Sequence, residues 1–193
     1  MISKSKHIIF FATGNVHKFN EVRALLSEHG IAVAMLKAKG TEIQSDSIVD
    51  IAKTSVVSAF EKYKLPLLVE DAGLFIDALN GFPGPYAAFA FKTIGNTGIL
   101  KLLENVKNRQ AAFKSAISYY DYETKSALSF EGQIIGKISL NEKAKDSESV
   151  FGFDPIFIPN GSDKTFAQMS LEEKNKYSHR AIAISKFVQW YKS

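Results

Sequence analysis

Residues 8–30 read IIFFATGNVHKFNEVRALLSEHG, and this stretch sets the fold class. Its first part, residues 8–12, is a continuous apolar run that ends at a glycine-containing turn, which is typical of a strand buried on both faces. Apolar side chains then recur at helical spacing through residues 19–26, and Gly30 is placed to end the predicted helix. A buried strand that leads into a helix is how an α/β sheet begins.

The next segments repeat this alternation of strand and helix. Residues 31–36 indicate a second strand, and Ser47 is placed to cap a helix whose apolar stripe runs through residues 48–60. Residues 67–69 (LLV) then predict a short third strand that ends at Glu70-Asp71. Strands that alternate with helices favour an α/β fold.

The middle and the end of the chain follow other patterns. Residues 112–120 and 127–140 are long β-rich runs on either side of a polar turn at residues 122–125, which predicts an antiparallel hairpin. A closing helix is expected after Ser178, with apolar positions facing the core. The 193 residues are therefore expected to fold as a single α/β domain, residues 1–193, made of two lobes with a cleft between them.

The composition excludes several classes of protein. Hydrophobic residues make up 46% of the chain and charged residues 23%, a balance that rules out wholesale disorder, collagen and coiled coil. The chain has no cysteine, so disulfides, thiol nucleophiles, iron–sulfur clusters and zinc fingers are excluded. The absence of cysteine also fits a reducing compartment.

Lysine and arginine total 24 against 20 acidic residues, which gives a net charge of +4. This excess fits either an ordinary soluble protein or a basic pocket for an anionic ligand, whereas a nucleic-acid-binding surface usually shows denser basic clusters. No apolar run approaches the roughly 20 residues of a membrane helix. The apolar run at residues 8–12 is too short for a secretory signal. We therefore expect a cytoplasmic protein that binds neither nucleic acid nor membrane.

Residues 13–18 (TGNVHK) lie between the predicted first strand and first helix. Backbone N–H groups at a helix start, a glycine that permits close approach and a lysine together make a phosphate-binding turn. The spacing of a Walker loop is absent. A capped turn with an incidental lysine explains the same residues, so both interpretations stay open.

Glu70 and Asp71 directly follow the predicted third strand. Ligand sites in α/β sheets gather at such strand ends, where adjacent carboxylates can hold a hard cation through oxygen or deprotonate water. The alternative interpretation is a solvated strand end. Glu42 offers a further carboxylate if its loop folds toward the same place, which sequence spacing does not decide.

Three further segments depart from ordinary core and surface. Residues 80–86 (NGFPGPY) make a stiff loop, either shaped for a ligand or simply a turn. The aromatic residues of segment 151–155 (FGFDP) either stack on a base or fill the core. His179 and Arg180 fall in the first turn of the closing helix, where the helix dipole disfavours cations. They suit an anion or a purine ring placed opposite, or else an exposed helix start.

Taken together, these segments resemble the inosine triphosphate pyrophosphatase family, whose members hydrolyse non-standard purine nucleoside triphosphates. The matching stretches run in order from Thr13 to Phe187: TGNVHKFNEV, TEIQSDS, VEDAGLFIDALNGFPGPY, FGFDPIF and TFAQMSLEEKNKYSHRAIAISKF. Each is unspecific alone, but their order and spacing together identify the family. The resemblance implies an elongated mixed β-sheet in two lobes flanked by helices, with the site in a central cleft, and a homodimer.

The resemblance also implies a role for individual residues. Mg²⁺ would be the cofactor, held by Glu42 and Asp71 with assistance from Glu70, and Asp71 would take the proton of the attacking water. Ala72 stands where the family usually has serine or threonine, which leaves only its backbone N–H, and Gln168 replaces a common glutamate. The residues expected to bind the nucleotide are Thr13, Gly14, Asn15, Val16, His17, Lys18, Ala72, Phe151, Gly152, Phe153, Asp154, Lys174, His179 and Arg180.

The reaction implied is hydrolysis of ITP, dITP or XTP at the α-phosphorus, which gives the monophosphate and pyrophosphate. A hydrogen-bond donor such as Arg180 or His179 would face the 6-oxo group of the purine. ATP has an amino group at this position and would leave the donor unpaired, so ATP would be rejected. Three other functions stay as alternatives. They are a nucleotide sensor without catalysis, a nucleic-acid-binding protein suggested only by the pI near 9.1, and a pyrophosphatase for modified pyrimidine nucleotides.

Overall fold

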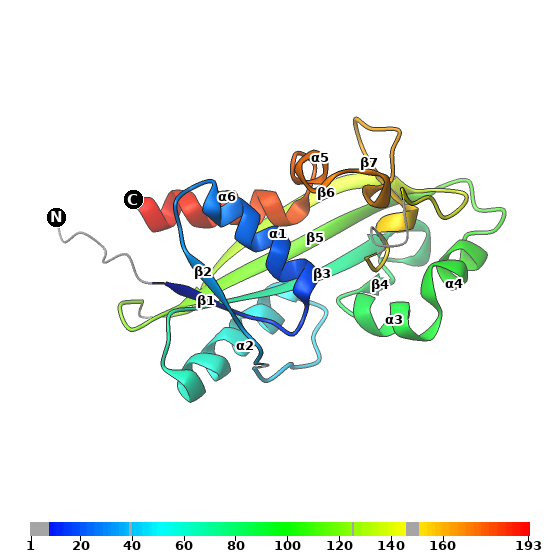
Figure 1. The fold of residues 1–193 in the computed structure, drawn as a ribbon. Coiled ribbons are helices and arrows are strands. Elements are labelled where there is room, and N and C mark those ends of the chain that lie inside the picture. The colour runs from blue at the N-terminus through cyan, green and yellow to red at the C-terminus, as the bar shows by residue number, and fades with distance from the viewer. Residues whose placement is uncertain (1–7, 39, 125, 146–150) are drawn as a thin grey trace. The chain divides into compact units, whose positions relative to one another are not determined.

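The computed structural model of the chain describes residues 8–38, 40–124, 126–145 and 151–193 (Figure 1). The chain divides into two compact units, each with its own hydrophobic core. The prediction that they make up a single domain stays a prediction. Unit 1 comprises the chain as far as Asp71 together with Ala116–Glu131 and Arg180–Ser193, and unit 2 comprises Ala72–Ser115 and Gly132–His179.

The predicted alternation of strand and helix in unit 1 is confirmed. Asn15 caps the first helix, because its side-chain oxygen accepts a hydrogen bond from the Lys18 N–H at 3.1 Å. Ser47 caps the second helix in the same way, through the Asp50 N–H. The elements are β1 (Ile9–Ala12), α1 (Val16–Ser27), β2 (Val33–Leu36), α2 (Ile48–Tyr63), the first half of β3 (Leu67–Ile76) and nearly all of α6 (His179–Lys192).

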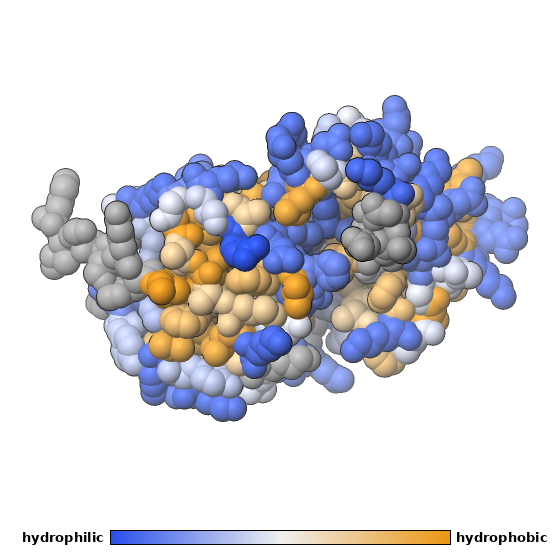
Figure 2. All heavy atoms as spheres, in the orientation of Figure 1, coloured by the Kyte–Doolittle hydropathy of each residue, from blue (hydrophilic) through white to orange (hydrophobic). Residues whose placement is uncertain are grey.

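Helices cover both faces of the sheet in unit 1, which explains why β1 is apolar along its whole length. Helices α1 and α6 pack on one face and α2 on the other (Figure 1). The half-buried strand β2 forms the sheet edge, and apolar side chains gather around it in Figure 2. The first core includes Ile9, Phe11, Leu68, Ala183 and Phe187, and the second includes Ala12, Val56, Phe60, Leu67 and Val69.

Unit 2 contains the other parts of the long strands β3, β5 (Gln110–Tyr120) and β6 (Leu128–Ile138). The strand order is β2-β1-β3-β5-β6-β7, with β4 paired to β3. Strand β1 pairs in parallel with its neighbours, whereas β4 and β7 pair antiparallel, so the sheet is mixed and the predicted α/β fold class is confirmed. The remaining elements are β4 (Pro83–Gly84), α3 (Ala87–Thr93), α4 (Gly95–Leu102), β7 (Phe157–Pro159) and α5 (Leu171–Asn175).

The predicted hairpin is confirmed. Strands β5 and β6 are neighbours in the sheet, and the connection at residues 121–127 is too short for a parallel crossover. The Ser118 and Ser129 hydroxyls meet across the pair at 2.7 Å. Lys125, in the predicted turn, lies outside the described residues.

The third strand is longer than predicted. Strand β3 continues to Ile76, so Glu70-Asp71 lies inside the strand and not at its end; that prediction is wrong. The strand continues because its second half pairs with β4, an interaction that sequence periodicity does not reveal. The two backbones approach so closely that a Cβ on Gly73 would collide with the Gly84 carbonyl.

Helices α3 and α4 were not predicted. Both helices are short, glycines occupy positions 95 and 98 of α4, and Phe89 of α3 is 69% exposed, so it does not mark a buried face. Within the described ranges, every helix is too short or too polar to cross a membrane.

Asp121 organises the turn between β5 and β6. Its carboxylate accepts hydrogen bonds from the Tyr119 hydroxyl at 2.6 Å and from the Glu123 and Thr124 N–H groups at 2.9 and 2.8 Å. Burial alone would raise the pKa of Asp121, but these hydrogen bonds to the charged form lower it below its ordinary value. Such a carboxyl stabilises the fold above its unfolded pKa, and the contribution is lost as the pH falls through the folded pKa.

We therefore expect Asp121→Asn to melt at a lower temperature than the unmodified protein at neutral pH. The difference should shrink as the pH falls below about 4, the range in which the unfolded carboxyl is protonated. Thermal unfolding followed by circular dichroism over this pH range measures it, with the exposed Asp46→Asn as control. A melting difference that does not change with pH would contradict this role of Asp121.

Candidate active site

The predicted phosphate-binding turn, residues 13–18, comprises the link from β1 to α1 and the first residues of α1, all in unit 1. The Asn15 N–H donates to the Thr13 hydroxyl at 3.1 Å, and the Asn15 side chain caps the helix. No heavy atom lies within 4 Å of a Cβ built on Gly14, so the turn is open at that point. A capped turn is therefore present, and it brings together a helix N-terminus and Lys18, both of which attract anions.

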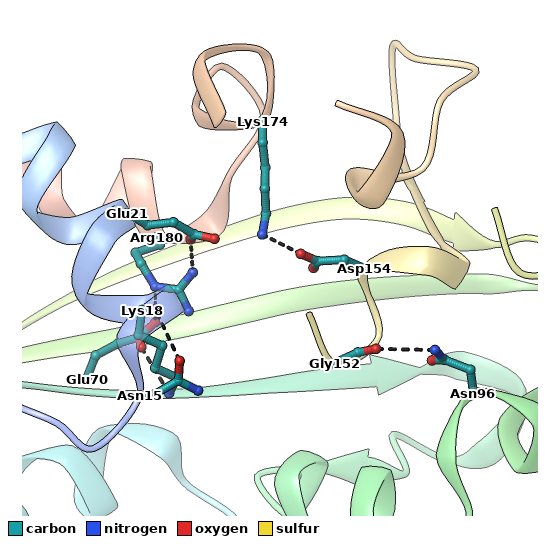
Figure 3. A network of polar contacts seen from close by, with 9 residues as sticks. All are labelled: Asn15, Lys18, Glu21, Glu70, Asn96, Gly152, Asp154, Lys174 and Arg180. Atoms are coloured by element: carbon teal, nitrogen blue, oxygen red, sulfur yellow. Dashed lines mark hydrogen bonds and ion pairs between the residues drawn. The ribbon is translucent and has the colours of Figure 1, made fainter. Parts of the chain in front are cut away.

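Two cations bind Glu70 in the middle of β3 (Figure 3). Lys18 Nζ lies 3.0 Å from Glu70 Oε2, and Arg180 Nε donates to Oε1 at 2.8 Å. The Glu70 side chain is fully buried, that of Arg180 is 2% exposed and that of Lys18 is 21% exposed. A solvated strand end is therefore excluded for Glu70. Glu70 lies next to the phosphate-binding turn because β1 and β3 run in parallel. Their last pair is Phe11 with Leu68, so the residues that follow on each strand lie side by side.

Glu21 of α1 completes this group, which we call the ion-pair cluster: Lys18, Glu21, Glu70 and Arg180. Its carboxylate accepts a hydrogen bond from the Arg180 guanidinium. The negative charges of its two carboxylates equal the positive charges of its two cations, so the cluster has no net charge. Burial alone would lower the pKa of Arg180, but the attraction of Glu70 and Glu21 raises it above its ordinary value. The predicted contact of Arg180 with a purine stays a prediction.

Sequence reasoning missed Glu21. The residue is 5% exposed and lies on the buried face of α1 beside Val22 and Leu25. The sequence does show that Glu21 adjoins the apolar stripe of the predicted helix. This position indicates a buried carboxylate, which needs a cation as its partner. The sequence alone does not identify Arg180 as that partner.

Asp71 lies on the opposite face of β3 from Glu70, because side chains alternate along a strand. Leu68 belongs to the core under α1 and α6, whereas Val69 belongs to the core under α2. Asp71, two residues after Val69, is therefore on the α2 side, where it is half-buried. Ala72, the next residue of β3, is also half-buried.

Glu42 is exposed in the loop before α2. Its neighbour Thr41 is held on α2, since its N–H and hydroxyl contact the Ser58 hydroxyl at 3.2 and 2.9 Å. The Glu42 loop is thus attached to the helix that covers the Asp71 side of the sheet. Within the described ranges, no three histidine, cysteine or acidic side chains gather closely enough to hold a metal ion.

In unit 2, Asp154 and Lys174 form a buried ion pair (Figure 3). Lys174 Nζ lies 2.5 Å from Asp154 Oδ2, and the two side chains are 7% and 8% exposed. The ammonium group also lies 5.6 Å from the centre of the Phe151 ring and 5.4 Å from that of Phe166. The structure thus brings together three of the nucleotide-binding residues predicted in this unit.

The other predicted residues of unit 2 have different surroundings. Phe153 is 4% exposed and packs edge-on against Phe91, so it fills the core. His179 stacks on Phe113 with ring centres 4.9 Å apart and is 4% exposed. Arg180, the next residue, belongs to unit 1 and is 2% exposed. The alternative of an exposed helix start is therefore wrong.

Gln168 has a structural role that needs no charge. Its side-chain oxygen accepts a hydrogen bond from the Thr165 N–H at 3.0 Å, which caps the short 3₁₀ turn Phe166–Gln168. An uncharged amide oxygen is a sufficient acceptor for this bond.

Comparisons with known proteins agree over nearly the whole chain. The profile of the Ham1 family matches residues 9–190. The dITP/XTP pyrophosphatase of Methanopyrus kandleri is 46% identical over 185 residues, which cover 96% of each chain. That of Thermococcus kodakarensis is 44% identical over 182 residues, or 94% of this chain and 96% of the relative. The solved structure of the Staphylococcus aureus Ham1 protein has a TM-score of 0.80 at 27% identity and covers 96% of this chain and 98% of that one.

These likenesses confirm the resemblance based on the sequence motifs, and the relatives' names agree with the non-standard purine nucleotides that it implied. The chain belongs to the Ham1 family.

Proposed function

We propose that this chain hydrolyses non-standard purine nucleoside triphosphates, namely ITP, dITP and XTP, to the monophosphate and pyrophosphate. The observation that carries the proposal is the position of Lys18 in the first turn of α1, where its ammonium group lies 3.0 Å from Glu70 Oε2. Glu70 lies on β3, the strand that also carries Asp71. The dITP/XTP pyrophosphatases at 46% and 44% identity support the same reaction.

Residues 13–18 would bind the triphosphate. Lys18 is the most exposed member of the ion-pair cluster, at 21%, so it is the member that an incoming phosphate reaches. When Lys18 turns to a phosphate, Glu70 keeps its bond to Arg180 and remains paired. The amide groups at the start of α1 add further donors of the kind that bind phosphate.

Mg²⁺ is the cofactor that fits the available donors. It commonly takes one or two carboxylates and completes its octahedron with water and phosphate oxygens, and we assign the carboxylates to Glu42 and Asp71. When bound, Mg²⁺ neutralises phosphate charge that would otherwise repel the nucleophile. Glu70 has both oxygens engaged by Lys18 and Arg180, so we assign it to positioning and not to the metal.

Asp71 would act as the general base. It takes the proton of the water that attacks the α-phosphorus, and the bond from this phosphorus to the bridging oxygen breaks as pyrophosphate leaves. Lys18 would stabilise the negative charge that develops on the leaving pyrophosphate.

Segment 151–154, Lys174 and His179 would bind the nucleoside. The Phe151 ring offers an aromatic face, and the buried pair of Asp154 with Lys174 offers polar groups in a dry environment. A donor placed opposite the 6-oxo group is left unpaired by adenine, and such a site can reject the wrong base by about 10⁴-fold. His179 is our candidate donor, because its ring is buried and its orientation is set by the stack on Phe113.

The family resemblance supports a homodimer, and the charge and apolar patterns of the sequence favour a cytoplasmic location with no nucleic-acid or membrane partner. We include these properties in the proposal.

Product analysis with a panel of nucleotides tests this function. With ITP and Mg²⁺ we expect IMP and pyrophosphate in equal amounts, slow turnover of ATP, dTTP and UTP, and no turnover after chelation of the metal. IDP with orthophosphate would show a γ-phosphatase, and binding without turnover would show a nucleotide sensor. Faster hydrolysis of dTTP or UTP would indicate a pyrimidine enzyme.

A further inference from the structure

Asn96 contacts the predicted nucleotide-binding segment from outside it. The residue lies in the first turn of α4, is 6% exposed and belongs to unit 2, as does Gly152. Its side-chain Nδ2 donates to the Gly152 carbonyl at 3.3 Å, and Figure 3 shows this bond. None of the sequence motifs included Asn96.

The same amide group also binds Glu142. Asn96 Nδ2 lies 3.3 Å from Glu142 Oε2, and the Thr97 hydroxyl lies 3.5 Å from Oε1. A carboxylate at the N-terminus of a helix is favourable, because the helix dipole is positive there. Glu142 therefore holds the start of α4 and, through Asn96, the amide group that binds Gly152.

The bond to Gly152 acts at the turn of the segment. Gly152 has a φ of +54°, a left-handed conformation that suits glycine. After this turn, Phe153 is fixed in the core and Asp154 is fixed by Lys174. Before it lies Phe151, which is only half-buried. The Asp154 N–H closes the turn by donating to the Phe151 carbonyl at 3.0 Å, and the Asn96 amide holds the Gly152 carbonyl of this turn from outside the segment.

We infer that Asn96 is a positioning residue for base recognition: it holds the Gly152 turn so that Phe151 and Asp154 are placed for the purine. The inference rests on the proposed function. The hydrogen bond acts on the segment that binds the base and not on Asp71 or the phosphate-binding turn. Its loss should therefore weaken binding of the nucleotide and leave the chemical step unchanged.

Asn96→Leu tests the inference, because it keeps the approximate size of the side chain and removes the amide donor without placing a second carboxylate beside Glu142. We expect the KM for ITP to rise about tenfold, equivalent to about 1.4 kcal/mol. We expect kcat to stay within about twofold, because the lost bond affects binding and not the chemical step. We expect the preference for ITP over ATP to fall, because the base is held less precisely. Asn96→Ser gives the same test with a smaller side chain.

Thr97→Ala is the matched control, since it removes a contact with Glu142 and leaves the Asn96–Gly152 bond intact. We expect its KM and its preference for ITP to match those of the unmodified protein. An unchanged KM in both Asn96 variants, a loss in kcat alone, or an equal effect of Thr97→Ala would overturn the inference. Absence of ITP hydrolysis by the unmodified protein would instead overturn the proposed function.

Discussion

Asp71→Asn is expected to lower kcat for ITP hydrolysis about a thousandfold, within the range that general-base catalysis contributes. Asparagine has the shape of aspartate but does not accept a proton from water. The phosphate-binding turn and segment 151–154 are untouched by the change, so nucleotide binding should survive. Steady-state kinetics with pyrophosphate detection and calorimetric titration with ITP measure the two effects separately.

The control for this prediction is Asp77→Asn, an exposed carboxyl six residues further along the chain. We expect it to turn over ITP at the rate of the unmodified protein. Near-normal kcat in Asp71→Asn would remove Asp71 from the chemistry. Loss of ITP binding together with kcat would show that the metal-holding role proposed for Asp71 outweighs its role as the base.

Arg180→Met is expected to lower the free energy of unfolding by about 3–5 kcal/mol, the cost of removing one partner of a buried ion pair. Glu70 is fully buried and Glu21 nearly so, and Arg180 donates to both. With methionine at this position, Glu70 and Glu21 both lose the guanidinium that donates to them, while Lys18 stays close to Glu70. Urea unfolding followed by fluorescence measures the change.

Two comparisons separate this effect from general damage to a helix. Arg23→Met on α1 removes an exposed arginine whose guanidinium lies over the Phe19 ring, and it should cost much less. The double variant Glu70→Gln with Arg180→Met should recover part of the stability, because one buried charge is removed with its partner. A loss below about 1 kcal/mol for Arg180→Met, the value of a surface pair, would show that Glu70 and Glu21 do not depend on the guanidinium as buried charges.

The strand and helix elements of unit 1 could be predicted because their causes are local. The apolar run at residues 8–12 indicates a strand covered on both faces, and Asn15 and Ser47 are side chains that cap helices. The length of β3 could not be predicted, because its second half exists through pairing with β4 at Gly84. A partner strand is a tertiary contact, and hydrophobic period does not encode it.

The candidate site shows the same division. Lys18 and Glu70 were singled out because each follows a recognisable strand, but their contact depends on how far β1 and β3 pair. The opposite orientation of Glu70 and Asp71 follows from the alternation of a strand, and it was missed because the strand was predicted to end before them. Glu21 and Asn96 were missed because their partners, Arg180 and Gly152, are distant in the chain.

The position of Arg180 in the sequence has a consequence for synthesis of the protein. Its two carboxylate partners lie 110 and 159 residues earlier, so both are made long before the guanidinium that neutralises them. A nascent chain that has reached residue 179 contains both carboxylates but not yet the Arg180 guanidinium that donates to them. Premature stop codons just upstream of the last helix should therefore yield chains that proteases remove, even though every strand has been translated.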